Sequence, residues 1–78
     1  MDIKKVLIQE IAEHMGIERS KVLLETSFKE LGADSLDELI IIMIAEEALQ
    51  IELPDEVLTE TSTVGEFVQE VSNMAGIT

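Results

Sequence analysis

A single serine, Ser35, is the residue of this chain best suited to covalent chemistry, and it lies in the run Gly32-Ala33-Asp34-Ser35-Leu36. The glycine predicts a tight turn, and residues 36–49 contain no Gly, Pro or basic residue. This pattern predicts a helix that begins near Asp34 or Ser35. At the start of a helix, a hydroxyl is exposed and lies beside backbone N–H groups that have no partner within the helix. Because such N–H groups attract anions, the position favours a phosphate ester on Ser35 over a buried structural role.

Other reactive residue types are scarce. The chain has no cysteine, and therefore no thiolate or disulfide of its own. Its only histidine, His14, falls in the last turn of the first predicted helix, where it suits the negative end of the helix dipole. No second ligand accompanies it, so we expect a surface or capping histidine and no metal site. No base is placed to activate Ser35, and the short chain leaves no room for an enzyme cleft, so we do not expect an enzyme.

Three helical segments are predicted around this serine. Apolar residues at helical spacing predict a first helix with Asp2 as its N-cap and Gly16 as its end; they are Ile3, Val6, Leu7, Ile11 and Met15. Pro54 ends the second helix, and residues 55–58 are expected to form a short helical turn. A capping box in Thr63-Val64-Gly65-Glu66 begins the last helix, whose inner stripe is Val64, Phe67, Val68 and Val71. We therefore expect an all-α fold, a small bundle of three main helices plus one short helix, in a single domain over residues 1–78.

The structure of two segments is less obvious from the sequence. Residues 17–34 are long for a structureless loop, so apolar side chains are expected to anchor this connector to the core; they are Ile17, Val22, Leu23, Leu24, Phe28 and Leu31. Residues 39–44 have the β-propensity of a buried strand. The uninterrupted stretch from residue 35 to about residue 50 is long for a strand and ordinary for a helix, which favours the helix.

The second predicted helix is apolar on two opposite sides. At about 100° per residue, one side holds Ile41, Ala45, Ala48 and Leu49, and the other holds Leu36, Leu39, Ile40 and Met43, with Glu46 and Glu47 at its far end. A bundle this small cannot enclose a helix that is apolar all round. We expect one side to lie in the core and the other to meet a partner.

Charge is unevenly distributed along the chain. All five basic residues lie within 1–29, whereas residues 30–78 hold twelve acidic residues and no Lys or Arg, which accounts for the net charge of −12. Such a chain is poorly suited to nucleic acid. It favours basic patches on partner proteins, and the acidic residues also keep an apolar domain soluble. The longest apolar run, residues 39–45, is too short to span a membrane, and no signal peptide is visible, so a cytoplasmic setting is expected.

The motif and its spacing resemble those of acyl carrier proteins. The resemblance covers nearly the whole chain and rests on three stretches, Leu31-Gly32-Ala33-Asp34-Ser35-Leu36-Asp37, Ile51-Glu52-Leu53-Pro54-Asp55 and Ser62-Thr63-Val64. It implies that Ser35 carries 4′-phosphopantetheine, attached from coenzyme A by a phosphopantetheinyl transferase. A chain without cysteine would obtain its thiol in this way. The thiol would hold acyl groups as thioesters and present them to separate enzymes of fatty acid, lipid or polyketide-type biosynthesis.

The resemblance also implies roles for residues of the second helix. The acyl pocket would be lined by Ile41, Ala45 and Leu49, and partners would be recognised by Asp34, Leu36, Asp37, Leu39, Ile40, Met43, Glu46 and Glu47. Ile40 departs from the family, which usually has a glutamate there. Ala45, Leu49 and Gln50 also depart, where a larger aliphatic residue, phenylalanine and glycine are usual. These departures indicate a specialised carrier, loaded and used by enzymes whose docking patches are basic and partly apolar. A monomer is expected, with a homodimer through Leu39, Ile40 and Met43, or packing of this face under the connector, as the alternative.

Two other functions fit the residues. A peptidyl carrier belongs to the same class, although such domains usually have a second glycine, and often a histidine, before the serine. An unmodified acidic adaptor that binds basic helices would use Ser35 only as a helix cap or first-turn residue, with Asp34 as an N-cap. Replacing Ser35 by alanine separates these functions, because an adaptor keeps its partners whereas a carrier loses all acyl transfer.

Overall fold

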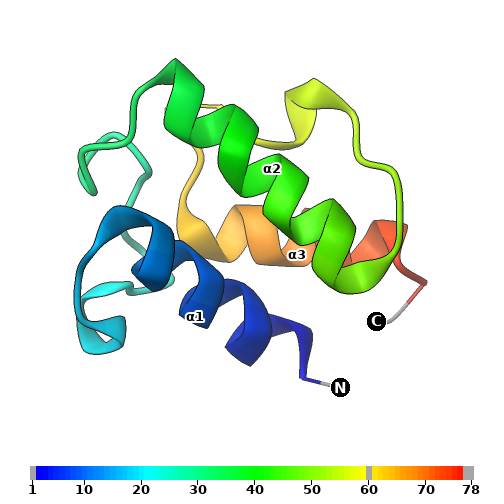
Figure 1. Ribbon diagram of the computed structural model, residues 1–78, viewed down its shortest axis with the longest axis horizontal. Coiled ribbons are helices and arrows are strands. Elements are labelled where there is room, and N and C mark those ends of the chain that lie inside the picture. The colour runs from blue at the N-terminus through cyan, green and yellow to red at the C-terminus, as the bar shows by residue number, and fades with distance from the viewer. Residues whose placement is uncertain (1, 60, 77–78) are drawn as a thin grey trace.

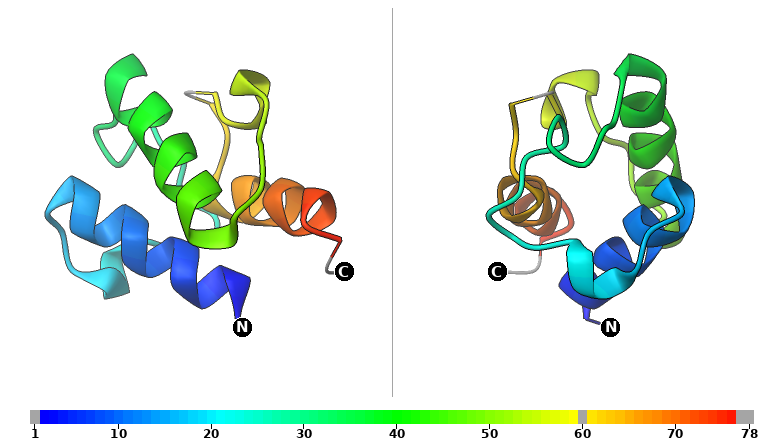
Figure 2. Two further views of the ribbon diagram at one scale, coloured as in Figure 1. Left: turned by 45° about the vertical axis from the view of Figure 1, so that its right-hand side comes forward. Right: turned by 90° about the vertical axis from the view of Figure 1, so that its left-hand side faces the viewer.

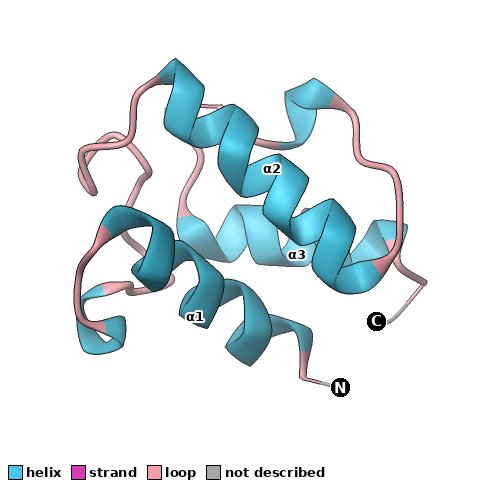
Figure 3. Ribbon diagram, in the orientation of Figure 1, coloured by secondary structure: helices cyan, strands magenta, loops and turns pink. Residues whose placement is uncertain are grey.

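The computed structural model describes residues 2–59 and 61–76. All the regular elements within these ranges are helices (Figure 3). Three α-helices, α1 (Ile3–Met15), α2 (Ser35–Leu49) and α3 (Val64–Met74), are joined by connectors that contain the short 3-10 helices η1 (Arg19–Lys21) and η2 (Asp55–Val57). The fold is all-α, as predicted. The short helix expected over residues 55–58 is η2, whereas the sequence did not indicate η1.

The helices pack so that the end of α1 meets the start of α2. These two helices contact each other and run in opposite directions, while α3 lies behind them and contacts α1 (Figure 1 and Figure 2). The connector between α1 and α2 therefore begins and ends at the same side of the molecule. The first turn of α2, which begins with Ser35, lies beside the last turn of α1.

Local capping explains where α1 begins and ends and where α3 begins. The Asp2 side chain accepts a hydrogen bond from the Lys5 N–H at 3.2 Å at the start of α1. At its end, Gly16 adopts a left-handed conformation with φ 69°, which glycine reaches without a steric penalty. Thr63 and Glu66 exchange two hydrogen bonds, of 3.1 and 2.8 Å, in the predicted capping box of α3. These are short-range interactions, and for that reason the sequence alone predicts them.

The core is formed by one side of each helix together with connector residues. Its buried members are Ile3, Leu7, Ile11 and Ala12 of α1, Ile41, Ile42 and Ala45 of α2, Val64, Phe67, Val68 and Val71 of α3, and Val22, Phe28, Leu53, Val57 and Leu58. Phe28 and Phe67 meet edge to face, with ring centroids 5.7 Å apart. This contact holds the α1–α2 connector against α3. The predicted inner stripe of α3 is confirmed.

Two of the six predicted anchors of the connector are wrong. Val22 and Phe28 are buried, but Leu23 and Leu24 are 47 % and 40 % exposed. At this point the backbone makes the attachment, because the Leu24 carbonyl accepts the Gly65 N–H at 2.9 Å. A Cβ atom on Gly65 would lie 3.0 Å from the Leu24 oxygen, so glycine permits this close approach. The other two anchors, Ile17 and Leu31, are partly buried and pack against the core.

Candidate functional site

Ser35 is the first residue of α2, and the turn before it is held by a pair of carboxylates. Gly32 has φ 87°, a conformation that favours glycine, and Asp34 is the N-cap. Asp34 Oδ1 accepts the Asp37 N–H at 2.9 Å, and Asp37 Oδ2 accepts the Asp34 N–H at 3.0 Å. This reciprocal capping box fixes the first turn. The expectation that Asp34 caps the helix is confirmed.

The capping box leaves part of the first turn available. Ser35 is exposed, and within residues 2–59 and 61–76 no hydrogen bond is formed by its hydroxyl or by the N–H groups of Ser35 and Leu36. These N–H groups lie at the positive end of the α2 dipole. The Asp37 and Glu38 carboxylates of the same turn oppose this positive potential. An exposed hydroxyl beside free N–H groups can accept a phosphate group and hydrogen-bond its oxygens.

His14 has a partner that the sequence did not indicate. Its Nε2 lies 2.9 Å from Asp37 Oδ1, and both side chains are mostly covered, at 19 % and 28 % exposed. Hydrogen bonds from the Asp34 N–H and from His14 hold the pKa of Asp37 below its ordinary value. The sequence analysis did not assign His14 to this site. The two residues are 23 positions apart, and only the antiparallel packing of α1 and α2 brings them together.

One side of α2 is open to solvent. Leu36 and Met43 are each 63 % exposed and Leu39 is 45 % exposed. These three residues, which we call the open face, extend from Ser35 along the helix, and Glu47 lies exposed beyond them. Ile40, which the sequence analysis placed on the same side of the helix, is half-buried. It lies at the border of the face, towards the side on which α1 packs.

The opposite side of α2 lies in the core. Ile41 and Ala45 are buried and Leu49 is half-buried and packs against the core. Ile42 is buried as well, although the sequence analysis placed it on neither side. The buried side is broad because α2 is covered by α1 and also by η2.

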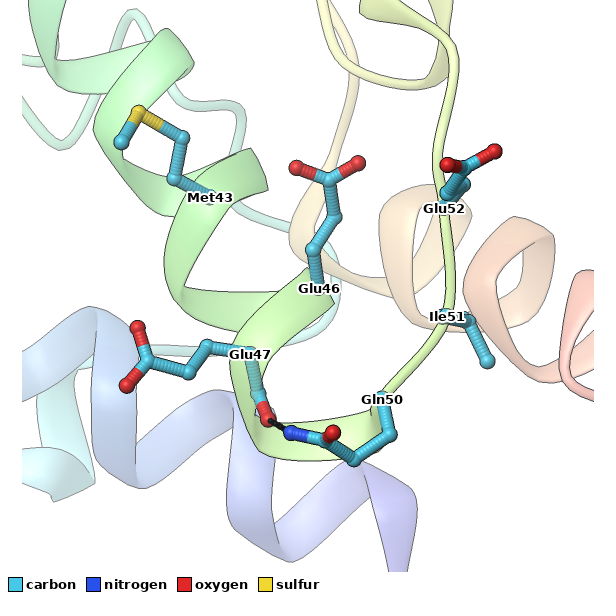
Figure 4. A pocket seen from close by; sticks show the side chains of 6 residues that line it. All are labelled: Met43, Glu46, Glu47, Gln50, Ile51 and Glu52. Atoms are coloured by element: carbon cyan, nitrogen blue, oxygen red, sulfur yellow. Dashed lines mark hydrogen bonds between the residues drawn. The ribbon is translucent and has the colours of Figure 1, made fainter.

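A groove opens at the C-terminal end of α2. Its volume is about 530 Å³, and it is lined by Met43, Glu46, Glu47, Gln50, Ile51 and Glu52 (Figure 4). Gln50 adopts a left-handed conformation and its side-chain amide donates to the Glu47 carbonyl. Glu46 is half-buried, and its Oε2 accepts the Leu53 N–H at 2.8 Å. Glu46 therefore holds the backbone after α2, whereas Glu47 is exposed.

These features define a small helical carrier domain, with an exposed hydroxyl at the start of a helix whose next turns are apolar and open. Residues 5–71 match the family model described as a phosphopantetheine attachment site. The match extends from α1 to α3, and the chain belongs to this family. It is a phosphopantetheine carrier, with 4′-phosphopantetheine as its covalent prosthetic group, and such a domain is modified by a phosphopantetheinyl transferase and meets partner enzymes. No helix in the described part of the chain is long and apolar enough to cross a bilayer.

Proposed function

We propose that this protein is an acyl carrier protein and that Ser35 is its attachment residue. The observation that carries the proposal is the exposed Ser35 hydroxyl on the first residue of α2. It lies beside the N–H groups of Ser35 and Leu36, to which no side chain of the described residues is hydrogen-bonded. The Ser35 hydroxyl would attack the phosphorus of coenzyme A that carries the pantetheine arm; the pyrophosphate bond breaks, adenosine 3′,5′-bisphosphate leaves, and the Ser35 oxygen becomes one ester oxygen of a phosphodiester. The N–H groups of Ser35 and Leu36 can then donate to the phosphate. When attached, the group supplies a thiol that holds an acyl chain as a thioester.

The proposed role in this reaction is that of a substrate and carrier, without catalysis. No base among the described residues contacts the Ser35 hydroxyl, so the transferase would supply the group that takes its proton. We expect the chain to act as a single carrier domain over residues 1–78 in the cytoplasm, between separate enzymes of fatty acid, lipid or polyketide-type biosynthesis. The acidic second half supports docking to basic enzyme surfaces.

For partner recognition we propose the open face together with the carboxylates at its two ends. Asp34 lies at the Ser35 end and Glu47 at the far end, and both are exposed. Asp37, Ile40 and Glu46 border this surface and are half-buried. An enzyme that docks here would offer apolar side chains to the open face and basic side chains to its ends.

The buried side of α2 is the proposed acyl pocket. Ile41 and Ala45 lie inside the core, with Leu49 beside them. Ala45 is fully buried and has the smallest of these side chains. An acyl chain that enters the bundle along α2 would have to displace core contacts, and it would displace the fewest side-chain atoms of this side at Ala45.

Intact mass spectrometry tests the attachment residue. The chain is incubated with coenzyme A and a transferase of broad specificity, beside the variants Ser35→Ala and Ser20→Ala. Ser20 is an exposed serine in η1 and serves as the matched control. We expect the native chain and Ser20→Ala to gain one phosphopantetheine and Ser35→Ala to gain none. A gain on Ser35→Ala would refute Ser35 as the attachment residue.

A further inference from the structure

A contact between α1 and α2 reaches the turn that presents Ser35. The Asp37 carboxylate uses both of its oxygens, because Oδ1 is paired with His14 Nε2 at 2.9 Å and Oδ2 accepts the Asp34 N–H at 3.0 Å. Asp34 in turn accepts the Asp37 N–H at 2.9 Å. His14 is thus connected, through Asp37, to the residue immediately before Ser35.

This connection helps to fix the first turn of α2, which has little buried surface to hold it against the core. The side chains of Asp34, Ser35 and Leu36 are all exposed, so burial does little to hold this part of the chain in place. Beyond the capping box, the described contacts of the turn include one from another element, the His14 side chain. His14 is itself mostly covered and belongs to the α1 helix, whose Ile11 is buried in the core. The contact therefore ties an exposed turn to a rigid element.

We propose that His14 is a positioning residue for the modification of Ser35, since its contact with Asp37 holds the capping box closed and keeps the Ser35 turn in the geometry on which a transferase docks. This inference rests on the proposed function. His14 does not touch the reacting atoms. Without its contact, Asp37 can leave the capping box, and the transferase must order the turn when it binds. The cost appears in binding, and the chemical step itself is unaffected.

The variants His14→Leu and His14→Gln separate this role from simple packing. Leucine fills the site but has no donor, whereas the glutamine amide can donate to Asp37 from a place close to that of Nε2. The matched control is Gln69→Leu, which removes an exposed side-chain hydrogen bond of 3.0 Å to Asn73 on α3. Each unmodified chain is titrated against the transferase and coenzyme A, and the initial rate is followed by intact mass.

We expect His14→Leu to raise the KM for the carrier about three- to tenfold with little change in kcat, the range that one lost hydrogen bond implies. His14→Gln and Gln69→Leu should stay within about twofold of the native chain, as a retained or irrelevant hydrogen bond implies. Amide hydrogen exchange of Asp34 and Asp37, whose N–H groups are hydrogen-bonded in the capping box, should be faster in His14→Leu than in His14→Gln, while exchange in α3 is the same in both.

Two results would overturn the inference, namely an unchanged KM for His14→Leu, or an increase in His14→Gln as large as that in His14→Leu. If His14→Leu loses its helical circular dichroism, His14→Met replaces it, because methionine has about the length of glutamine, no N–H to donate and no charge that would repel Asp37. If the native chain is modified at Ser35 and the His14 variants have the KM of the native chain, only the role of His14 is refuted. If the native chain is not modified at Ser35, the proposed function itself is refuted.

Discussion

Replacing Met43 by glutamine tests whether the open face of α2 is a docking surface. Met43 lies in the middle of α2 and is 63 % exposed, so in the free chain only about a third of its apolar surface is covered, which is worth about 0.5–1 kcal/mol. Glutamine is nearly as good a helix former as methionine and adds no charge. We therefore expect the melting temperature to fall by only about 2–8 °C, as the size of the domain implies.

The effect on docking is expected to be larger than the effect on folding. If a partner covers the remaining two thirds of the side chain, the native chain gains about 1–2 kcal/mol that Met43→Gln loses, which corresponds to about a 5- to 30-fold increase in KM. The assay measures the KM for the carrier in the transferase reaction and the melting temperature of each chain. Met74→Gln is the matched control, because Met74 is 45 % exposed and lies at the far end of α3.

A specific result would refute this reasoning. If Met43→Gln is modified with the KM of the native chain, the transferase does not dock on the open face, and exposure of these residues has another cause. If Met43→Gln and Met74→Gln raise the KM equally, the change reflects a general loss of stability or solubility. Only a large increase in KM for Met43→Gln, with similar melting temperatures for both variants, supports the docking surface.

Three further predictions concern stability and the core. The pKa of Asp37 lies below its ordinary 3.8 in the folded chain. The ionised Asp37 therefore stabilises the fold above pH 3.8, and this stabilisation is lost as the pH falls through the lowered pKa. Urea unfolding should show that the native chain is more stable than Asp37→Asn at pH 7 and that the difference disappears in acid. Thr63→Ala removes the α3 cap and should lower the melting temperature by about 4–8 °C without changing KM in the transferase reaction. Ala45→Leu overfills a fully buried position, which should destabilise the unloaded chain by about 1–3 kcal/mol. Calorimetry should also show a smaller rise in melting temperature for this variant when a medium-length acyl chain is attached.

The parts of the fold that the sequence predicts are those set by neighbouring residues. Both ends of α1 and the start of α3 follow from Asp2, Gly16 and the Thr63 capping box, whose partners lie within four residues. The position of Ser35 at the start of α2 follows in the same way from Asp34. Such interactions depend on residue type and spacing alone, so a single sequence is enough to identify them.

The features that the sequence did not predict depend on contacts between distant segments. Leu23 and Leu24 are exposed, and the connector is attached at this point by the hydrogen bond between the Leu24 carbonyl and the Gly65 N–H. A hydrophobicity pattern contains no information about such backbone pairing. The pairing of His14 with Asp37 depends on the antiparallel packing of α1 and α2. The hydrogen bond between the Glu46 carboxylate and the Leu53 N–H was not predicted for a similar reason, because it forms only where the chain turns back after α2. Helical periodicity identified the buried and the open side of α2, but it did not predict that Ile40 is half-buried or that Ile42 is buried.

The charge of the chain bears on whether the open face meets an enzyme or a second copy. A symmetric dimer through Leu39 and Met43 would place the same face of each copy against the other. Glu47 is exposed at the end of this face, and residues 30–78 contain no Lys or Arg to oppose it. Two such faces would therefore repel each other, most strongly at low salt. A basic enzyme surface reverses the sign of this interaction while still covering the apolar residues. We infer that the acidic residues of α2 select against self-association and for an enzyme partner, so the mass of the free chain measured by light scattering at low salt should be that of a monomer.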